Sequence, residues 1–133
     1  MSNTQIDNTA ELKIWQQNLN TSLVAQESLL NSPDILDWDI LILQEPHINF
    51  LRNTRANHRW HVIYPTNHYT NPQQRTRAVT LIKASLDTNM WQQLSFPSSD
   101  VVLVQLNGTY GKCTIFNIYN DGTHHDTLRL IDQ

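Results

Sequence analysis

The 133-residue sequence contains one cysteine, three glycines and five prolines, and it has no long apolar run. Because Cys113 has no second cysteine to pair with, it closes no disulfide within the sequence, which is typical of a reducing compartment. No segment approaches the roughly 18 consecutive apolar residues of a membrane-spanning helix. The first dozen residues lack the apolar stretch of a signal peptide. We therefore expect an intracellular protein, nuclear or cytoplasmic, that is not secreted and binds no membrane.

Charge of each sign is missing from one part of the chain. Lys13 is the only lysine or arginine before residue 46, whereas residues 46–86 contain no aspartate or glutamate. This acid-free stretch carries Arg52, Arg55, Arg59, Arg75, Arg77 and Lys83, with aromatic residues between them. Such a segment is typical of contact with a nucleic-acid backbone. The alternative is a solvated basic loop whose charge is balanced by acids elsewhere in the fold.

Apolar patterning predicts a β-α-β unit at the start of the chain. We expect a strand over residues 12–17, a helix over 23–30 capped by Thr21 or Ser22, and a strand over 40–43 that is buried on both faces. Such a unit usually forms a right-handed parallel crossover. Further strands are predicted at the following ranges: 59–64, 78–83, 101–106 and 112–119, the last two as a hairpin.

The length predicts a single domain. We expect a disordered tail over residues 1–11 and a partial domain over residues 12–133. Thr123 and Asp126 have the spacing of a helix start, but the sequence ends at Gln133, soon after the predicted helix begins to present an apolar face. We therefore expect a fragment or a truncated gene product.

A carboxylate follows the most apolar strand of the sequence. Glu45 comes directly after Gln44 and before Pro46, which has no N–H to continue a strand. Open α/β sheets place their chemistry at the carboxyl ends of strands, and Mg²⁺ prefers carboxylate oxygens. Glu45 is therefore a candidate metal ligand; the alternative is that it only begins a solvated loop. Two other predicted strands end in polar groups that could converge with it, namely Asn18 after the first and Tyr119 and Asn120 after the last.

Six ordered motifs carry a family resemblance across residues 12–131. They are W-Q-Q-N-L-N, Q-E-P, T-R-A-N followed by W-x-V-I-Y-P, T-R before a strand, S-S-D-V and N-I-Y-N-D. In this order they resemble the endonuclease/exonuclease/phosphatase superfamily. Within it, they are most similar to the AP-endonuclease-like nuclease domain of non-LTR retrotransposons, particularly the fungal type.

The resemblance implies an α/β fold that is half of a four-layer sandwich. We expect one mixed sheet covered by one helix layer, with the second half of the domain absent. Because the strands carry apolar groups toward both faces, we also expect the face of this sheet that has no helices to be bare.

The resemblance also implies a function and the residues that perform it. The expected reaction is Mg²⁺-dependent DNA endonuclease activity, with Mn²⁺ as a substitute metal, that nicks a target for retrotransposition. Glu45 and Asn18 correspond to metal-site residues, and Tyr119 to the third catalytic residue. Arg75, Arg77 and Asn120 are the predicted contacts to nucleic acid, and a reverse transcriptase is an expected companion in the intact protein.

The sequence departs from the family in two motifs. The intact family has a G-D-x-N motif and an S-D-H motif, and neither occurs here; Ser99-Asp100 is followed by Val101. We therefore expect the chain to be inactive by itself and to require the missing C-terminal half. The alternatives are a non-catalytic retroelement remnant that at most binds nucleic acid weakly, and a phosphomonoesterase of the same superfamily.

Overall fold

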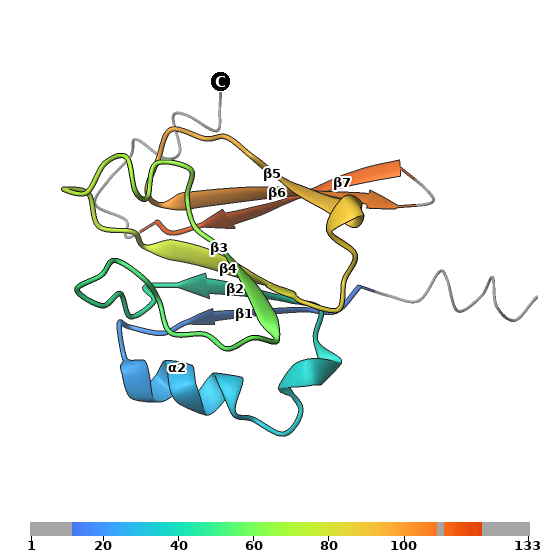
Figure 1. The fold of residues 1–133 in the computed structure, drawn as a ribbon, viewed down its shortest axis with the longest axis horizontal. Helices are drawn as coiled ribbons and strands as arrows, with labels where there is room; N and C mark the ends of the chain where they lie inside the picture. The colour runs from blue at the N-terminus through green and yellow to red at the C-terminus, as the bar shows by residue number, and fades with distance from the viewer. Residues whose placement is uncertain (1–11, 109–110, 121–133) are drawn as a thin grey trace, which may run out of the picture.

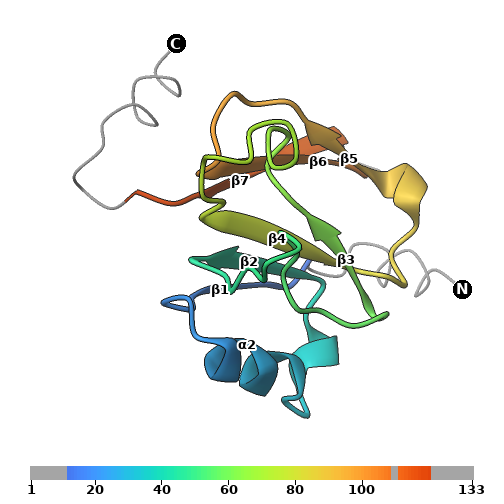
Figure 2. The same cartoon turned by 60° about the vertical axis from the view of Figure 1, so that its left-hand side comes forward.

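The computed structural model describes residues 12–108 and 111–120. These residues form three layers, with helix α2 on one side, a four-stranded sheet in the middle and a three-stranded sheet on the other side (Figure 1, Figure 2). The elements are β1 (Ile14–Asn18), α2 (Leu23–Leu30), η1 (Ile35–Asp37), β2 (Ile40–Gln44), β3 (Trp60–Ile63), β4 (Ala78–Lys83), η2 (Thr88–Met90), β5 (Trp91–Leu94), β6 (Val101–Gly108) and β7 (Gly111–Ile118). The predicted tail and the predicted helix after Thr123 lie outside the described residues.

The four-stranded sheet has the order β1-β2-β4-β3. β1 and β2 are parallel, as the β-α-β pattern predicted, while β4 runs antiparallel to both β2 and β3. The strand predicted over 78–83 is confirmed residue for residue. The second sheet is antiparallel with the order β5-β6-β7. Its first strand was not predicted, because Trp91-Gln92-Gln93-Leu94 has no β-branched residue and little alternation.

Helix α2 begins and ends where its flanking residues dictate. The Ser22 hydroxyl accepts a hydrogen bond from the Ala25 N–H at 3.0 Å and so caps the amino end. Asn31 forms the carboxyl cap, and the following Ser32-Pro33 does not continue the helix. In the described part of the chain, no helix is long and apolar enough to cross a membrane.

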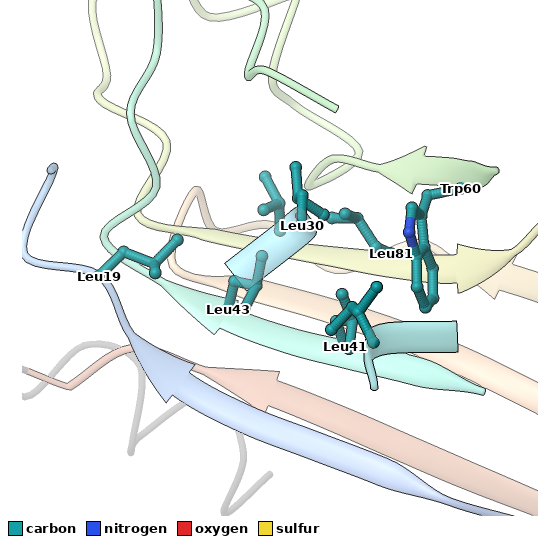
Figure 3. Packing of buried hydrophobic residues seen from close by; sticks show 8 residues of the cluster. Leu19, Leu30, Leu41, Leu43, Trp60 and Leu81 are labelled. Carbon is teal, nitrogen blue, oxygen red and sulfur yellow. The ribbon is translucent and has the colours of Figure 1, made fainter. Parts of the chain in front are cut away.

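The first apolar core lies between α2 and the middle sheet. Leu41 and Leu43 of β2 and Leu81 of β4 point to this side and are fully buried (Figure 3). The remaining buried members come from the helix, the strands and the loops between them: Leu19, Leu30, Ile35, Trp60 and Val79. Each such side chain contributes about 1.5–3 kcal/mol relative to an exposed one. This core fixes the helix against the sheet and orients the strand ends.

A second apolar core lies between the two sheets, and it corrects one prediction. Ile40 and Ile82 of the middle sheet pack with Val102 and Val104 of β6, and all four are buried. The α/β class is confirmed, but the expectation of one sheet with a bare face is wrong, because β5-β6-β7 covers that face. Strand patterns predict hairpins, but they do not specify the sheet that a hairpin joins.

Side-chain amides join the two sheets at one end of this core. The Asn117 Oδ1 atom of β7 accepts a hydrogen bond from Gln44 Nε2 of β2 at 2.8 Å. Asn117 Nδ2 lies 2.7 Å from the Val79 carbonyl oxygen and 3.1 Å from Thr80 Oγ1, both in β4. Gln16 Nε2 of β1 donates to Gln44 Oε1. These buried polar groups are thus satisfied across four strands.

The loop between β3 and β4 closes around a buried histidine. The imidazole of His68 is 1% exposed and stacks on the ring of Tyr64, with 4.1 Å between their centroids. His68 Nε2 faces the Arg52 carbonyl oxygen, so this nitrogen carries the proton, and Nδ1 accepts from the Thr76 hydroxyl. Burial lowers the pKa of the His68 imidazole, opposed by the bond to the Arg52 carbonyl and assisted by the Arg52 cation.

We predict that replacing Asn117 with alanine destabilises the sandwich by about 2–3 kcal/mol, because it leaves the buried Gln44 amide without its acceptor. Urea unfolding followed by tryptophan fluorescence measures this change. Lys112→Ala, on the exposed start of the same strand, is the control and is expected to change stability by less than about 0.5 kcal/mol. Equal unfolding midpoints for the two variants would show that the amide contact between the sheets contributes nothing.

We also predict that acid destabilises the fold through His68. Below the usual histidine pKa of 6.5, the unfolded chain binds a proton that the folded His68, with its lowered pKa, resists. The free energy of unfolding therefore falls as the pH drops from 6.5 through the lowered pKa of the folded state. Thermal melts across this range are expected to lose part of their pH dependence in His68→Gln and to keep it in His58→Gln, an exposed control. Identical pH profiles for the wild type and His68→Gln would contradict this assignment.

Candidate functional site

The predicted site residues come together at one end of the sandwich. The carboxyl ends of β1, β2 and β7 and the amino end of β4 lie on the left in Figure 1. Backbone hydrogen bonds connect these ends: the Glu45 N–H donates to the Arg77 carbonyl at 2.9 Å, and the Thr21 N–H donates to the Glu45 carbonyl at 2.8 Å. The convergence anticipated from the polar strand ends is therefore present.

The amide network of the core sets the position of each site residue. Its members Gln16, Gln44 and Asn117 belong to β1, β2 and β7. Asn18 lies two residues after Gln16, Glu45 directly follows Gln44, and Tyr119 lies two residues after Asn117. Because the three strands are connected to one another there, the three site residues emerge at the same level.

Glu45 has a strained backbone conformation. Its φ is +50°, and Asn20 and Thr21, which lie beside it, have φ values of +52° and +60°. Non-glycine residues seldom adopt this region, and a β-branched residue such as Thr21 does so at a particular cost. Clustered strain of this kind is common at functional sites. The half-buried Glu45 carboxylate makes no hydrogen bond or ion pair with any residue that the structure describes.

Asn18 is exposed at the end of β1, opposite Gln44 in the parallel ladder. Its Oδ1 atom accepts a hydrogen bond from the Asn20 N–H at 2.9 Å, which turns the chain toward Thr21 and Glu45. The amide therefore lies at the sheet edge beside the carboxylate's strand. An amide and a carboxylate at neighbouring strand ends supply oxygen donors to one side of the site.

Arg77, Asp100 and Tyr119 form a cluster beside Glu45. Arg77 Nε lies 3.1 Å from Asp100 Oδ1, and the guanidinium carbon lies 5.1 Å from the centroid of the Tyr119 ring. The Tyr119 N–H donates to the Asp100 carbonyl at 2.9 Å. The sequence analysis gave Asp100 no role; the signal available was its place in the S-S-D-V motif. Asp100 orients the arginine that lies over the tyrosine ring.

The basic stretch does not form one continuous patch. Arg55 pairs with Glu27, Arg77 pairs with Asp100, and Arg52 donates to the carbonyls of Pro72 and His68. Exposed Arg59 precedes β3 at the opposite end of the sandwich. Arg75 is exposed two residues before Arg77, at the same end as the site. Much of the predicted basic segment therefore stabilises loops, and Arg75 remains as an outward-facing cation near Glu45.

A depression of about 390 Å³ opens beside the site, between the ends of β1 and β7. Asn18 and Gln44 line one wall, and Tyr119 and Asn120 line the other. Gln16, Ile42, Phe116 and Ile118 complete the lining. Because β1 and β7 are the outermost strands of their sheets on this side, both present free backbone edges next to the depression.

The donor set was compared with what a magnesium ion requires. In the described part of the chain, no three histidine, cysteine, aspartate or glutamate side chains lie close enough together to hold a metal ion. Mg²⁺ commonly keeps several water ligands and binds through one or two carboxylates. Glu45, with the Asn18 amide beside it, fits the protein share of such a site. A second carboxylate would have to come from outside the described residues.

One solved structure has the same fold. No protein-family model and no curated protein matches the chain. The chain is similar to the endonuclease domain of TRAS1, a telomere-specific non-LTR retrotransposon, with a TM-score of 0.63 and 15% identity. The match covers 92% of this chain and 51% of that domain, so the chain spans about half of its length. The fold predicted from the family resemblance is therefore confirmed as the fold of part of such an endonuclease domain.

Proposed function

We propose that this chain is one half of a metal-dependent DNA endonuclease site and that it does not cleave DNA efficiently by itself. The observation that supports this most directly is that Asn18, Glu45 and Tyr119 emerge at one end of a fold shared with a retrotransposon endonuclease domain. The proposed substrate is a DNA phosphodiester. A reverse transcriptase and a target nicked for retrotransposition belong to the intact element in this proposal.

In the proposed site, Glu45 and Asn18 hold Mg²⁺, and Mn²⁺ substitutes for it. When bound, such an ion stabilises the charge that develops on the attacked phosphate and on the leaving oxygen. The strained backbone holds the Glu45 carboxylate at the mouth of the depression without a protein partner among the described residues. The carboxylate is thus available to a ligand, which would repay the cost of this conformation.

Tyr119 is the proposed phosphate-positioning residue. Its hydroxyl would donate a hydrogen bond to a non-bridging phosphate oxygen, and Arg77 and Asp100 would act on it indirectly by fixing the ring. Exposed Arg75 and Asn120 are the proposed contacts to the nucleic-acid backbone. Such contacts bind DNA weakly and without sequence preference.

The second half of the domain is the proposed partner. The groups that activate water and bind the phosphate in the family's G-D-x-N and S-D-H motifs would come from it. The free edges of β1 and β7 border the depression, so a second half that pairs with them would carry its groups toward Glu45 and Tyr119. If the chain binds neither metal nor DNA, the alternative of a non-catalytic remnant replaces this proposal.

We predict that the chain binds divalent metal weakly through Glu45. In a titration followed by nuclear magnetic resonance, Mg²⁺ is expected to shift the amide signals of Asn18 and Glu45, and Mn²⁺ is expected to broaden them. Glu45→Gln, which removes the charge and keeps the shape, should lose both effects. Glu27→Gln on α2 is the matched control, because it removes an exposed carboxylate away from the site.

The same proteins are expected to show little nicking of supercoiled plasmid in Mg²⁺. Loss of members of a catalytic set typically lowers the rate by several orders of magnitude. Mg²⁺-dependent nicking that Glu45→Gln abolishes would contradict the claim that the chain is incomplete, although the metal assignment would stand. Metal-induced shifts that persist in Glu45→Gln would contradict the metal assignment itself.

We further predict that Arg75 contributes to a weak, salt-dependent affinity for duplex DNA. Removing one phosphate contact reduces the slope of log affinity against log salt by about 0.9. Arg75→Ala is therefore expected to flatten the slope by about this amount in fluorescence anisotropy titrations. Arg59→Ala is the control, because Arg59 is an exposed arginine at the opposite end of the sandwich. Equal slopes for the two variants would count against the proposed DNA face.

A further inference from the structure

The loop that follows β2 displays two apolar side chains at its tip. Phe50 is 92% exposed and Leu51 is 63% exposed. Phe50 is the most exposed large apolar side chain in the described part of the chain. Phenylalanine dominates cores and interfaces because its burial removes a large apolar area from water. A phenylalanine held almost wholly in solvent therefore has an unused capacity for binding.

The tip is a well-ordered turn. The Asn49 Oδ1 atom accepts hydrogen bonds from the N–H groups of Leu51 and Asn53, at 2.9 and 3.0 Å. The Asn49 backbone also bonds to Arg52 and to Asn53, each at 2.9 Å. These contacts hold Phe50 and Leu51 outward, so a partner would pay little entropy to order them.

The base of the loop is anchored to the rest of the fold. Thr54 donates its N–H to the Tyr64 hydroxyl at 2.9 Å, and its own hydroxyl receives a hydrogen bond from the buried Gln26 amide of α2 at 2.7 Å. Arg52, at a φ of +67°, reaches back to the carbonyls of Pro72 and His68. The tip is thus fixed relative to the sheet that carries Glu45.

The tip lies at the same end of the sandwich as the candidate site. The loop leaves β2 at Glu45 and lies on the left in Figure 1. Phe50 is five residues from Glu45, so their Cα atoms are within roughly 17 Å of one another. Residues 46–86 contain no acid, and Arg75 is exposed at this end. Tyr69, 60% exposed and hydrogen-bonded to Asn53, adds a second aromatic ring near the base of the tip.

We propose that Phe50 and Leu51 form an apolar wedge that inserts against the bases of a DNA duplex held at this end of the sandwich. The inference rests on the proposed nuclease function and adds a contact that unstacks the substrate near the scissile phosphate. Proteins that kink DNA use phenylalanine and leucine in this way, next to cations that hold the phosphates. Unstacking separates neighbouring base pairs and widens access to the backbone beside them.

Two features favour DNA over a protein or a lipid surface. The exposed apolar area here is a two-residue tip with Asn49 and Asn53 beside it, whereas a stable protein interface needs about 800 Å² from each partner. The surrounding stretch has basic residues and no acids, which complements a phosphate backbone. Anionic vesicles share this charge, so they serve as the competing partner in the test.

The test uses a duplex with 2-aminopurine at a central position, whose fluorescence rises when the base loses its stacking. We expect the wild-type chain at low salt to raise this emission on binding. Phe50→Ala is expected to abolish the rise and to weaken binding on the order of tenfold. Because the lost contact is apolar, its salt slope should match the wild type, in contrast to Arg75→Ala. Phe50→Trp should retain the emission change.

Met90→Ala is the matched control. Met90 is 44% exposed in η2, which precedes β5 at the opposite end of the sandwich, and its removal should change neither emission nor affinity. Binding by the wild type without an emission change would overturn the wedge and leave the proposed DNA contact intact. A wild type that binds no duplex at all would overturn both. Loss of binding to phosphatidylserine vesicles in Phe50→Ala, with DNA binding unchanged, would overturn the wedge in favour of a membrane contact.

Discussion

The hydrogen bond from the Gln44 amide to Asn117 is the contact on which the arrangement of the site depends. It crosses the apolar core between two sheets that otherwise meet through Ile40, Ile82 and the valines of β6. Apolar contacts are nondirectional and tolerate small sliding, whereas a buried amide pair is satisfied in one register. With Gln16 also bonded to Gln44, three strand ends share one reference point. The level of the candidate metal carboxylate relative to the tyrosine follows from it.

Charge around the site is arranged to leave one carboxylate available. Arg77 is held by Asp100 and covers the face of Tyr119, so its charge is balanced within the protein. Glu45 lies next to this pair and has no such partner among the described residues. A half-buried carboxylate without a cation is costly to keep ionised unless a ligand offsets the cost. This contrast between Asp100 and Glu45 distinguishes a structural carboxylate from a ligand-binding one.

The three-layer form explains how half of a larger domain has two cores of its own. Helix α2 covers one face of the middle sheet, and β5-β6-β7 covers the other. What remains open is the side where β1 and β7 have free edges and where Ile14 and Trp15 are exposed. Neither the edge strand β1 nor its loop carries a proline or a charge within residues 14–18, the usual protection of a free edge. This side is the natural place for further strands.

The sequence by itself determined the local elements, because helix caps, turn residues and apolar alternation act over a few residues: α2, β4 and the β6–β7 hairpin were all predicted. It also predicted that Asn18, Glu45 and Tyr119 follow strands. Tertiary structure alone decided that the hairpin joins a second sheet, that Asp100 pairs with Arg77, and that most of the basic stretch is used internally. Those outcomes depend on contacts between residues far apart in the chain, such as Gln44 with Asn117, and a local pattern carries no information about which distant partner a buried polar group will find.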